Sequence, residues 1–394
     1  MNSDSLSGQS DVRQGPRFSA LRWERGVADQ FLGWRTTSGT ALQSMRTFAE
    51  AIARTLRQDG QQFLESGVLA SKLEPVLASC DHLTFDNGAE AIAYAALHLL
   101  DRYGRINQVL EYLIRIGRLP ARVRGARVLE VGAGPAPALY ATRDFYAALL
   151  RWPGLGDVKF GPLATFDTLD RGQAWDTFLH HLSESLMDVR GGALEDGSLA
   201  FRRSVHQFKG FDVTQRHHQS VAHSAARIAN EFDDADEPIS DATARQMAYD
   251  QGVPEPSAYD MAFLCNFLTQ PTMPVRFEPE LRRLLFSLTP GGLLVVLGAT
   301  GSSYPEIYSK VKAIAATAGL LDVSPPEALA ANADLGALDL VAEHVRANVK
   351  WAVANCPTEI RSVVEKALPE DLVDDTISFH LPRFRALVFV RQSP

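Results

Sequence analysis

The chain after Arg127 alternates short apolar runs with helical stretches. RVLEVGAG (127–134) and LATFDTLD (163–170) each end in a turn and precede a segment with helical apolar spacing, and SVHQFKGFDV, SAYDMAFLCNFL and GGLLVVLGA supply three further strands. Strands that alternate with helices form a parallel sheet covered on both faces. The final apolar run, RFRALVFVR, has no helix after it, which favours an antiparallel edge strand.

The part before Arg127 has a different pattern. Its first 40 residues are rich in Ser, Gly, Gln and Arg, with Trp23 and Trp34 as apolar anchors, and the spacing from Ala41 onward is helical. We therefore expect an α/β protein with an appended N-terminal helical domain. The expected parts are a flexible arm over 1–40, a helical lid or substrate domain over 41–124, and an α/β domain over 125–394 with an exposed acidic insertion near 228–258.

Charge weighs against a broad nucleic-acid surface, because phosphate binding needs clustered Lys and Arg and the net charge is -8. The segment from Asp101 to Arg127 nevertheless holds seven arginines and two acids. These arginines form either a local anion-facing patch or an ordinary solvated helix face.

Several classes of protein are disfavoured. The apolar runs fall short of the roughly 20 residues that span a bilayer, and the polar N-terminus lacks the apolar core of a secretion signal, so we expect a cytoplasmic protein with no membrane segment. The cysteines are far apart and the histidine groups lack ligand spacing, which argues against a metal site. The residues concerned are Cys80, Cys265, Cys356, His180, His181, His217, His218 and His223.

The turn in VLEVGAGPAPALYA is the strongest candidate for a ligand site. Gly132 and Gly134 let the backbone turn sharply and approach a ligand, and the following helix directs its free amides toward it. A dinucleotide fingerprint would have glycine where Pro137 stands, and a Walker loop would need a lysine that is missing. Both phosphate-binding interpretations are weakened.

This stretch resembles motif I of the class I S-adenosylmethionine-dependent methyltransferases, in which a strand ends in an acid followed by Gly-x-Gly. The resemblance covers about residues 125–300 and the last strand, and it implies a Rossmann-like sheet, mostly parallel with an antiparallel last strand, and S-adenosylmethionine as cofactor. It places Glu130 near the methionine amino end, and Gly132, Ala133 and Gly134 beside the methionine and ribose. Ala136 stands where the family has its third glycine.

The resemblance also assigns the later strand ends. Asp170 would accept both ribose hydroxyls, with Asp157 as the competing candidate. Asp212 would contact the adenine amino group, Val213 the ring, and Asn266 the cofactor and the substrate.

The function expected is methylation of a small-molecule acceptor on oxygen or nitrogen by in-line transfer. Tyr94, His98 and Asn266 are the candidates on the substrate side, followed by His82, Tyr304 and Tyr308. Tyr94 and His98 share a helix face, which fits a pocket lining but equally a boundary between core and solvent.

Two alternatives remain open. GAGPAPALYAT also resembles the mitochondrial-ribosome-assembly methyltransferase-like proteins, although their cysteine cluster is missing, so an RNA- or ribosome-associated methyltransferase is one. The other is a non-catalytic cofactor-binding regulatory scaffold. The sequence indicates neither the acceptor atom nor the oligomeric state.

Overall fold

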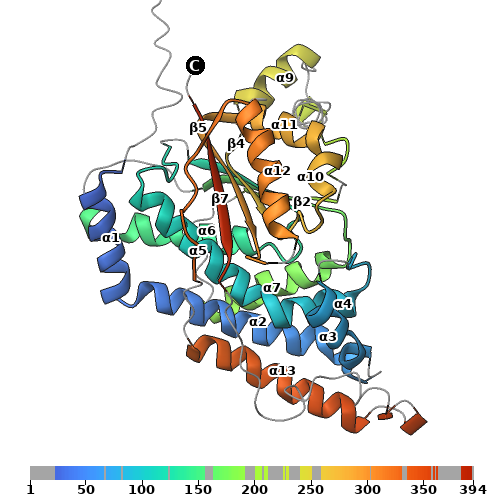
Figure 1. Ribbon diagram of the computed structural model, residues 1–394. Coiled ribbons are helices and arrows are strands. Elements are labelled where there is room, and N and C mark those ends of the chain that lie inside the picture. The colour runs from blue at the N-terminus through green and yellow to red at the C-terminus, as the bar shows by residue number, and fades with distance from the viewer. Residues whose placement is uncertain are drawn as a thin grey trace, which may run out of the picture.

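A computed structural model describes the chain over residues 23–65, 68–80, 83–122, 125–155, 163–190, 200–205, 208–211, 225–226, 228–229, 240–250, 259–301, 303–330, 335–355, 358–359, 361–362 and 383–392. Within these residues, a seven-stranded sheet has the order β3-β2-β1-β4-β5-β7-β6 and forms the centre of the molecule (Figure 1). The strands are β1 (Ala126–Val131), β2 (Leu163–Asp170), β3 (Ala200–Val205), β4 (Tyr259–Cys265), β5 (Leu288–Gly298), β6 (Leu320–Asp322) and β7 (Arg385–Arg391).

The strand directions confirm the expected fold class. Strands β1 to β5 pair in parallel, whereas β7 is antiparallel to both β5 and β6. The chain moves outward from β1 to β2 and β3 and then returns to place β4 on the other side of β1. This reversal is a topological switch point, at which open parallel sheets bind ligands.

The core divides into two apolar clusters because alternate strand residues point to opposite faces. On one face, Val128 and Phe263 pack under α6 (Pro137–Arg151) and α7 (Trp175–Val189). On the other, Leu129 and Leu264 meet α11 (Glu278–Ser287) and α12 (Tyr304–Thr317). Strand β4 is buried along its whole length, as expected of a central parallel strand.

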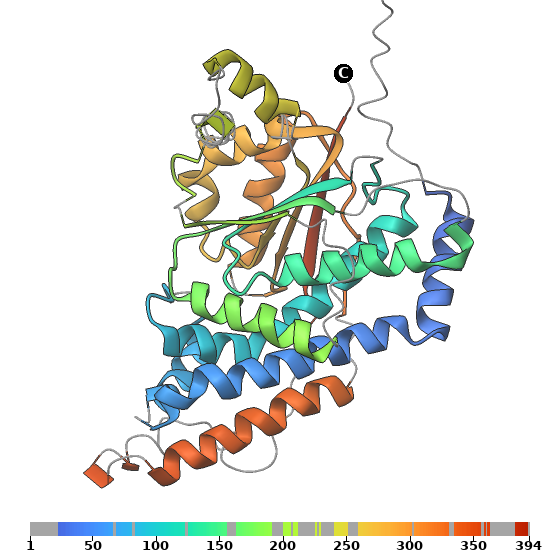
Figure 2. The same cartoon turned by 180° about the vertical axis from the view of Figure 1, so that it is seen from behind.

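A layer of helices covers the face that carries α6 and α7 (Figure 2). Helix α5 packs on α6, and the long α2 packs on α7 and α13. The helices of this layer are α1 (Arg25–Thr37), α2 (Thr40–Glu65), α3 (Val68–Ser79), α4 (Gly88–Tyr94), a π-helical turn (Ala95–Leu99), α5 (Leu100–Arg115) and α13 (Leu335–Asn355). No helix in the described ranges combines the length and apolarity needed to cross a membrane.

The helical layer differs from the expected division of the chain. Helix α13 comes from the C-terminal part of the sequence yet packs on α2. The flexible arm predicted over 1–40 is wrong from Trp23 onward, because Trp23 is 8% exposed and its Nε1 donates to the Leu119 carbonyl at 3.0 Å. Helix α1 buries Phe31 and Leu32, an apolar stripe that the polar composition around it obscured. Residues 1–22 lie outside the described residues.

The third strand lies earlier than the sequence predicts. It was expected to end at Asp212 and Val213, but β3 spans Ala200–Val205. β3 is at one edge of the sheet, and its sequence, AFRRSV, lacks the apolar run that marks the central strands. Of the acidic insertion expected near 228–258, the structure describes 228–229 and 240–250, the latter containing α9 (Asp241–Asp250).

Three arginines of the predicted basic segment are buried, so neither interpretation of that segment holds for them. Arg102, Arg105 and Arg122 are 8%, 3% and 2% exposed. Arg105 and Arg102 donate to Asp101 at 3.0 and 3.1 Å, and Arg122 Nε donates to Asp260 at 2.9 Å. These arginines neutralise acids inside the protein.

Candidate functional site

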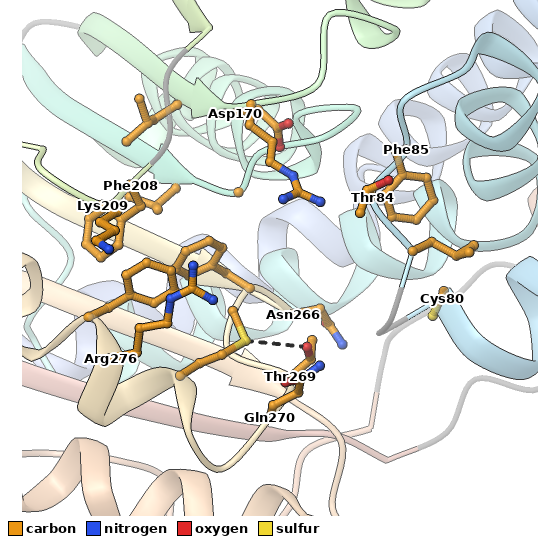
Figure 3. A pocket seen from close by; sticks show the side chains of 18 residues that line it. Cys80, Thr84, Phe85, Asp170, Phe208, Lys209, Asn266, Thr269, Gln270 and Arg276 are labelled. Atoms are coloured by element: carbon orange, nitrogen blue, oxygen red, sulfur yellow. Dashed lines mark hydrogen bonds between the residues drawn. The ribbon is translucent and has the colours of Figure 1, made fainter.

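A cavity of about 310 Å³ lies at the carboxyl ends of β1, β2 and β4 (Figure 3). Its walls come from the segment before α4, the turn after β1, the end of β2, the loop after β3, and the segment from β4 to the short helix α10 (Met273–Arg276). The lining residues are Cys80, Leu83, Thr84, Phe85, Val131, Gly132, Leu169, Asp170, Arg171, Phe208, Lys209, Asn266, Phe267, Thr269, Gln270, Met273, Arg276 and Phe277. This is the switch point of the sheet, and the volume suits a small molecule.

The glycine turn after β1 reaches the cavity through Gly132, whereas Ala133 and Gly134 are not among the lining residues. Gly132 and Gly134 have φ angles of 64° and 49°. The amides of Gly132 and Ala133 donate to the Leu169 carbonyl at 2.7 and 3.3 Å, which ties the turn to the end of β2. A β-carbon on Gly132 would lie 2.4 Å from Cδ2 of Phe267, so Phe267 can reach this turn only because residue 132 is glycine.

Replacing Gly132 with alanine is expected to destabilise the protein more than replacing Gly134. Both changes put a side chain at positive φ, which costs about 1 kcal/mol or more. Only Gly132→Ala also displaces Phe267, adding roughly 1–3 kcal/mol, since a β-carbon on Gly134 would meet Trp175 at an ordinary 3.5 Å. Urea unfolding of the two variants measures the difference. Equal losses would contradict the packing of Phe267 on the turn.

Asp170 is held rigidly at the end of β2. Its Oδ2 accepts from the Gly134 amide at 2.8 Å, and its Oδ1 accepts from the Gly172 amide at 2.8 Å. Each carboxylate oxygen has two lone pairs, so both oxygens keep a further acceptor position. Asp170 lines the cavity, and the carboxylate therefore has the geometry to accept two neighbouring hydroxyl groups of a ligand.

Glu130 lies under the turn and is not among the residues that line the cavity. It is fully buried, and its Oε1 accepts from the Ala138 amide at 3.2 Å in the first turn of α6. Its Oε2 has no hydrogen-bond partner among the described residues. Burial raises the pKa of this carboxyl group well above its usual value, against the opposing effect of the α6 amides. Glu130 thus occupies the amides that begin α6.

Asn266 leaves β4 at the floor of the cavity with a φ of 51°. Its backbone amide donates to the Leu297 carbonyl at 2.9 Å, and its side-chain Nδ2 lies 3.4 Å from the Tyr304 hydroxyl. The side-chain Oδ1 is buried and has no partner in the described part of the chain. Because this acceptor is covered by protein, a ligand N–H or O–H would reach it only after the amide turns toward the cavity. Tyr308 instead donates to the Ala299 carbonyl at 2.7 Å.

Tyr94 and His98 are near each other but do not line the cavity. Their rings are 5.0 Å apart, and Tyr94 packs edge-on against Phe85, also at 5.0 Å, so Phe85 is the residue that reaches the cavity. Burial, together with the nearby charge of Arg102, lowers the pKa of His98 to about 3. Burial likewise raises the pKa of Tyr94. Both side chains are therefore neutral at physiological pH.

The depressed pKa of His98 makes stability sensitive to acid. An unfolded histidine binds a proton below its ordinary pKa of 6.5, whereas His98 stays neutral in the folded protein down to about pH 3. The contribution of His98 to the free energy of unfolding is therefore fully present above pH 6.5 and is lost as the pH falls from 6.5 toward 3. At about pH 5 the loss is about 2 kcal/mol. The free energy of unfolding is measured at about pH 7.5 and at about pH 5. We expect the decrease between the two pH values to be smaller in His98→Gln than in the wild type, by the amount that His98 contributes. The control is exposed His180→Gln, which should leave it unchanged.

The sequence did not reveal the aromatic wall of the cavity. Phe208, Phe267 and Phe277 have ring centroids 5.4 to 5.5 Å apart and come from three different segments. Phe267 directly follows Asn266, which is a local signal. The other two carry none, because their contact depends on how the loop after β3 meets α10.

Some candidates lie elsewhere or outside the described residues. His82, Asp157, Asp212, Val213, His217, His218 and His223 fall outside them. His180 lies 3.4 Å from Glu184 on the exposed face of α7, and His181 pairs with Asp59. The described side chains include no group of three or more His, Cys, Asp and Glu arranged for a metal ion.

Comparison with known proteins finds similar solved structures only at low identity. No family model and no curated protein matches the chain. The [4+2]-cyclase SpnF is 14% identical with a TM-score of 0.34, over 74% of this chain and 81% of that one.

Two methyltransferase structures are similar to the same extent. Phosphoethanolamine N-methyltransferase 2 of Haemonchus contortus, in complex with S-adenosyl-L-methionine, is 13% identical with a TM-score of 0.34, over 82% of this chain and 60% of that one. A SAM-dependent methyltransferase from Thiobacillus denitrificans, in complex with S-adenosyl-L-homocysteine, is 14% identical with a TM-score of 0.34, over 75% and 91% of the two chains. Likenesses this weak carry no argument about activity, which has to come from the cavity itself.

Proposed function

We propose that this protein is an S-adenosylmethionine-dependent methyltransferase that acts on oxygen or nitrogen of a small-molecule acceptor. The observation that carries the proposal is the contrast between Glu130 and Asp170. A dinucleotide site offers the first amides of the helix after β1 to a pyrophosphate, but here the Glu130 carboxyl group binds the Ala138 amide. An adenosyl cofactor without phosphate does not need those amides.

The residues of the cavity fit the parts of such a cofactor. Asp170 would accept the two ribose hydroxyls, and the glycine turn at Gly132 would pass beside the methionine part. Phe208, Phe267 and Phe277 offer apolar faces for the adenine ring. When bound, S-adenosylmethionine supplies a methyl group that a sulfonium already activates, so the protein contributes mainly alignment and exclusion of water.

Asn266 is the proposed positioning residue at the reacting end. Its buried Oδ1 lacks a partner among the described residues, and it would accept a hydrogen bond from the acceptor hydroxyl or amine once the amide turns away from Tyr304 and toward the cavity. Tyr94 and His98, which do not line the cavity, would support the wall through Phe85 rather than exchange protons with the acceptor.

The RNA-directed alternative loses part of the feature that favoured it, because three arginines of the basic segment are buried while Arg115 and Arg118 stay exposed. Arg102, Arg105 and Arg122 are buried in ion pairs and are not available to phosphates. The regulatory scaffold differs from the proposal only in turnover, so an activity measurement separates the two.

Calorimetry with S-adenosylmethionine, S-adenosylhomocysteine and NAD on one preparation tests the proposal. We expect both adenosyl compounds to bind and NAD to give no heat. Transfer of radiolabelled methyl groups to members of an acceptor panel should follow. Tight binding of NAD alone would overturn the proposal, and cofactor binding without turnover across the panel would support the scaffold.

A further inference from the structure

Three cationic side chains line the cavity together with a single carboxylate. Arg171 follows the end of β2. Lys209 lies in the loop after β3 and Arg276 ends α10, and Asp170 is the only acid among the described residues of the lining (Figure 3). All three cationic residues are exposed. Across the described part of the chain, no carboxylate lies within 4.0 Å of any of their charged groups. Among the described residues, no carboxylate therefore compensates their charge.

The loop that carries Lys209 is anchored on α11. The Gly210 amide donates to Glu280 Oε1 at 2.9 Å, and Arg283 donates to the Phe211 carbonyl at 3.3 Å and to Glu280 at 3.1 Å. Glu280 is 6% exposed, and its carboxylate binds the Gly210 amide and Arg283. Lys209 thus lies in a loop that these bonds tie to α11.

Arg276 is positioned by the aromatic wall. Its guanidinium carbon lies 5.3 Å from the ring centroid of Phe277, and the Phe277 ring lies 5.5 Å from that of Phe208, the neighbour of Lys209 in sequence. A cation–π contact of this kind orients a guanidinium without neutralising it. Lys209 and Arg276 therefore flank one aromatic pair on the same side of the cavity (Figure 3).

The cofactor would not balance this charge. S-adenosylmethionine at neutral pH carries a sulfonium, an ammonium and one carboxylate, so it adds positive charge to a cavity that already has an excess. Arginine and lysine side chains bind carboxylate and phosphate groups through charge-assisted hydrogen bonds. We propose that the methyl acceptor is itself an anion, whose carboxylate or phosphate group binds to Lys209 and Arg276, with Arg171 adding to the attraction. This inference rests on the proposed function.

Binding of inorganic phosphate to protein saturated with S-adenosylhomocysteine provides the first test. We expect calorimetry to show phosphate binding that weakens about tenfold in Arg276→Gln and in Lys209→Gln, while affinity for S-adenosylhomocysteine stays within about twofold. Arg282→Gln is the matched control, because it removes the same charge from α11, where the guanidinium pairs with Glu278 at 2.7 Å. No phosphate binding to the wild type, or an equal loss in the control, overturns the inference. A loss of cofactor affinity in the two cavity variants would assign the cations to the cofactor and also overturns it.

A turnover screen with matched acceptors provides the second test. Amines and phenols are supplied with and without a carboxylate or phosphate group, and we expect methylation only of the anionic members. Methylation confined to the neutral members overturns the inference, and so does an RNA oligonucleotide that displaces phosphate and is methylated in its place. If S-adenosylhomocysteine fails to bind at all, the proposed function fails instead, and the two failures are therefore distinguishable.

Discussion

Replacing Asp170 with alanine is expected to weaken binding of S-adenosylhomocysteine by about 100-fold, from the loss of two charge-assisted hydrogen bonds to the ribose. The carboxylate can make both bonds because the amides of Gly134 and Gly172 hold its two oxygens at 2.8 Å each. Removal of the side chain also deprives the Gly134 amide of its acceptor, whereas the bonds from Gly132 and Ala133 to the Leu169 carbonyl remain. The effect on binding should therefore exceed the effect of any other single change in the cavity wall. Isothermal calorimetry measures it directly.

Two further variants test whether the loss of affinity comes from the Asp170 carboxylate itself. Asp170→Asn keeps an oxygen acceptor for one amide and one hydroxyl, and we expect an affinity loss of about tenfold. Thr84→Ala changes an exposed residue of the same cavity that is not expected to meet the ribose, and it should leave the affinity unchanged. Undiminished cofactor affinity in Asp170→Ala would contradict the assignment of this carboxylate to the ribose hydroxyls.

The second large effect concerns stability. Replacing Asp260 with alanine is expected to lower the free energy of unfolding by about 3–5 kcal/mol, because it leaves the Arg122 guanidinium buried without its counter-charge. The side chains of Arg122 and Asp260 are 2% and 0% exposed. Asp260 also accepts from the Arg127 amide at 3.0 Å and from Thr289 Oγ1 at 2.7 Å, so it joins the starts of β1, β4 and β5.

Urea unfolding of three variants tests this. The double replacement of Arg122 by Met and Asp260 by Leu removes both charges, and we expect it to recover a large part of the loss. Glu306→Ala removes the exposed partner of Lys310, with side chains 59% and 34% exposed, and should cost less than about 1 kcal/mol. A small effect of Asp260→Ala, comparable with that of Glu306→Ala, would contradict a structural role for the buried pair.

Sequence patterns predicted the central strands well because those strands have no polar face. β1, β2, β4 and β5 are largely buried, so they appear as apolar runs between turns. β7 was expected to be antiparallel because no helix follows it, which is confirmed, but the expected edge position is wrong, because β7 lies between β5 and β6. The edge positions carried less information. β3 contains two arginines and was expected too late in the chain, and β6, with three residues, is too short to give a periodic signal.

The helical layer shows a different limit. Apolar spacing predicted helices between Ala41 and residue 124, but it could not indicate that α13, nearly 300 residues later, packs on α2. Nor could it distinguish arginines that face water from arginines that neutralise Asp101 and Asp260. The packing of α13 and the burial of these arginines both depend on contacts between segments that are distant in the chain, and local propensity does not report such contacts.

The sequence by itself determined the parallel sheet and the turn at Gly132 and Gly134, because these follow from local apolar spacing and from the freedom of glycine at positive φ. It also singled out Asp170 as a strand-end acid. Only the tertiary structure decided that Asp170 and Asn266 share a cavity, that Glu130 lies beneath it on the first turn of α6, and that Tyr94 and His98 do not line it. The reason is physical: burial and side-chain direction are set by packing between elements, whereas spacing along the chain reports only which face of its own element a residue occupies.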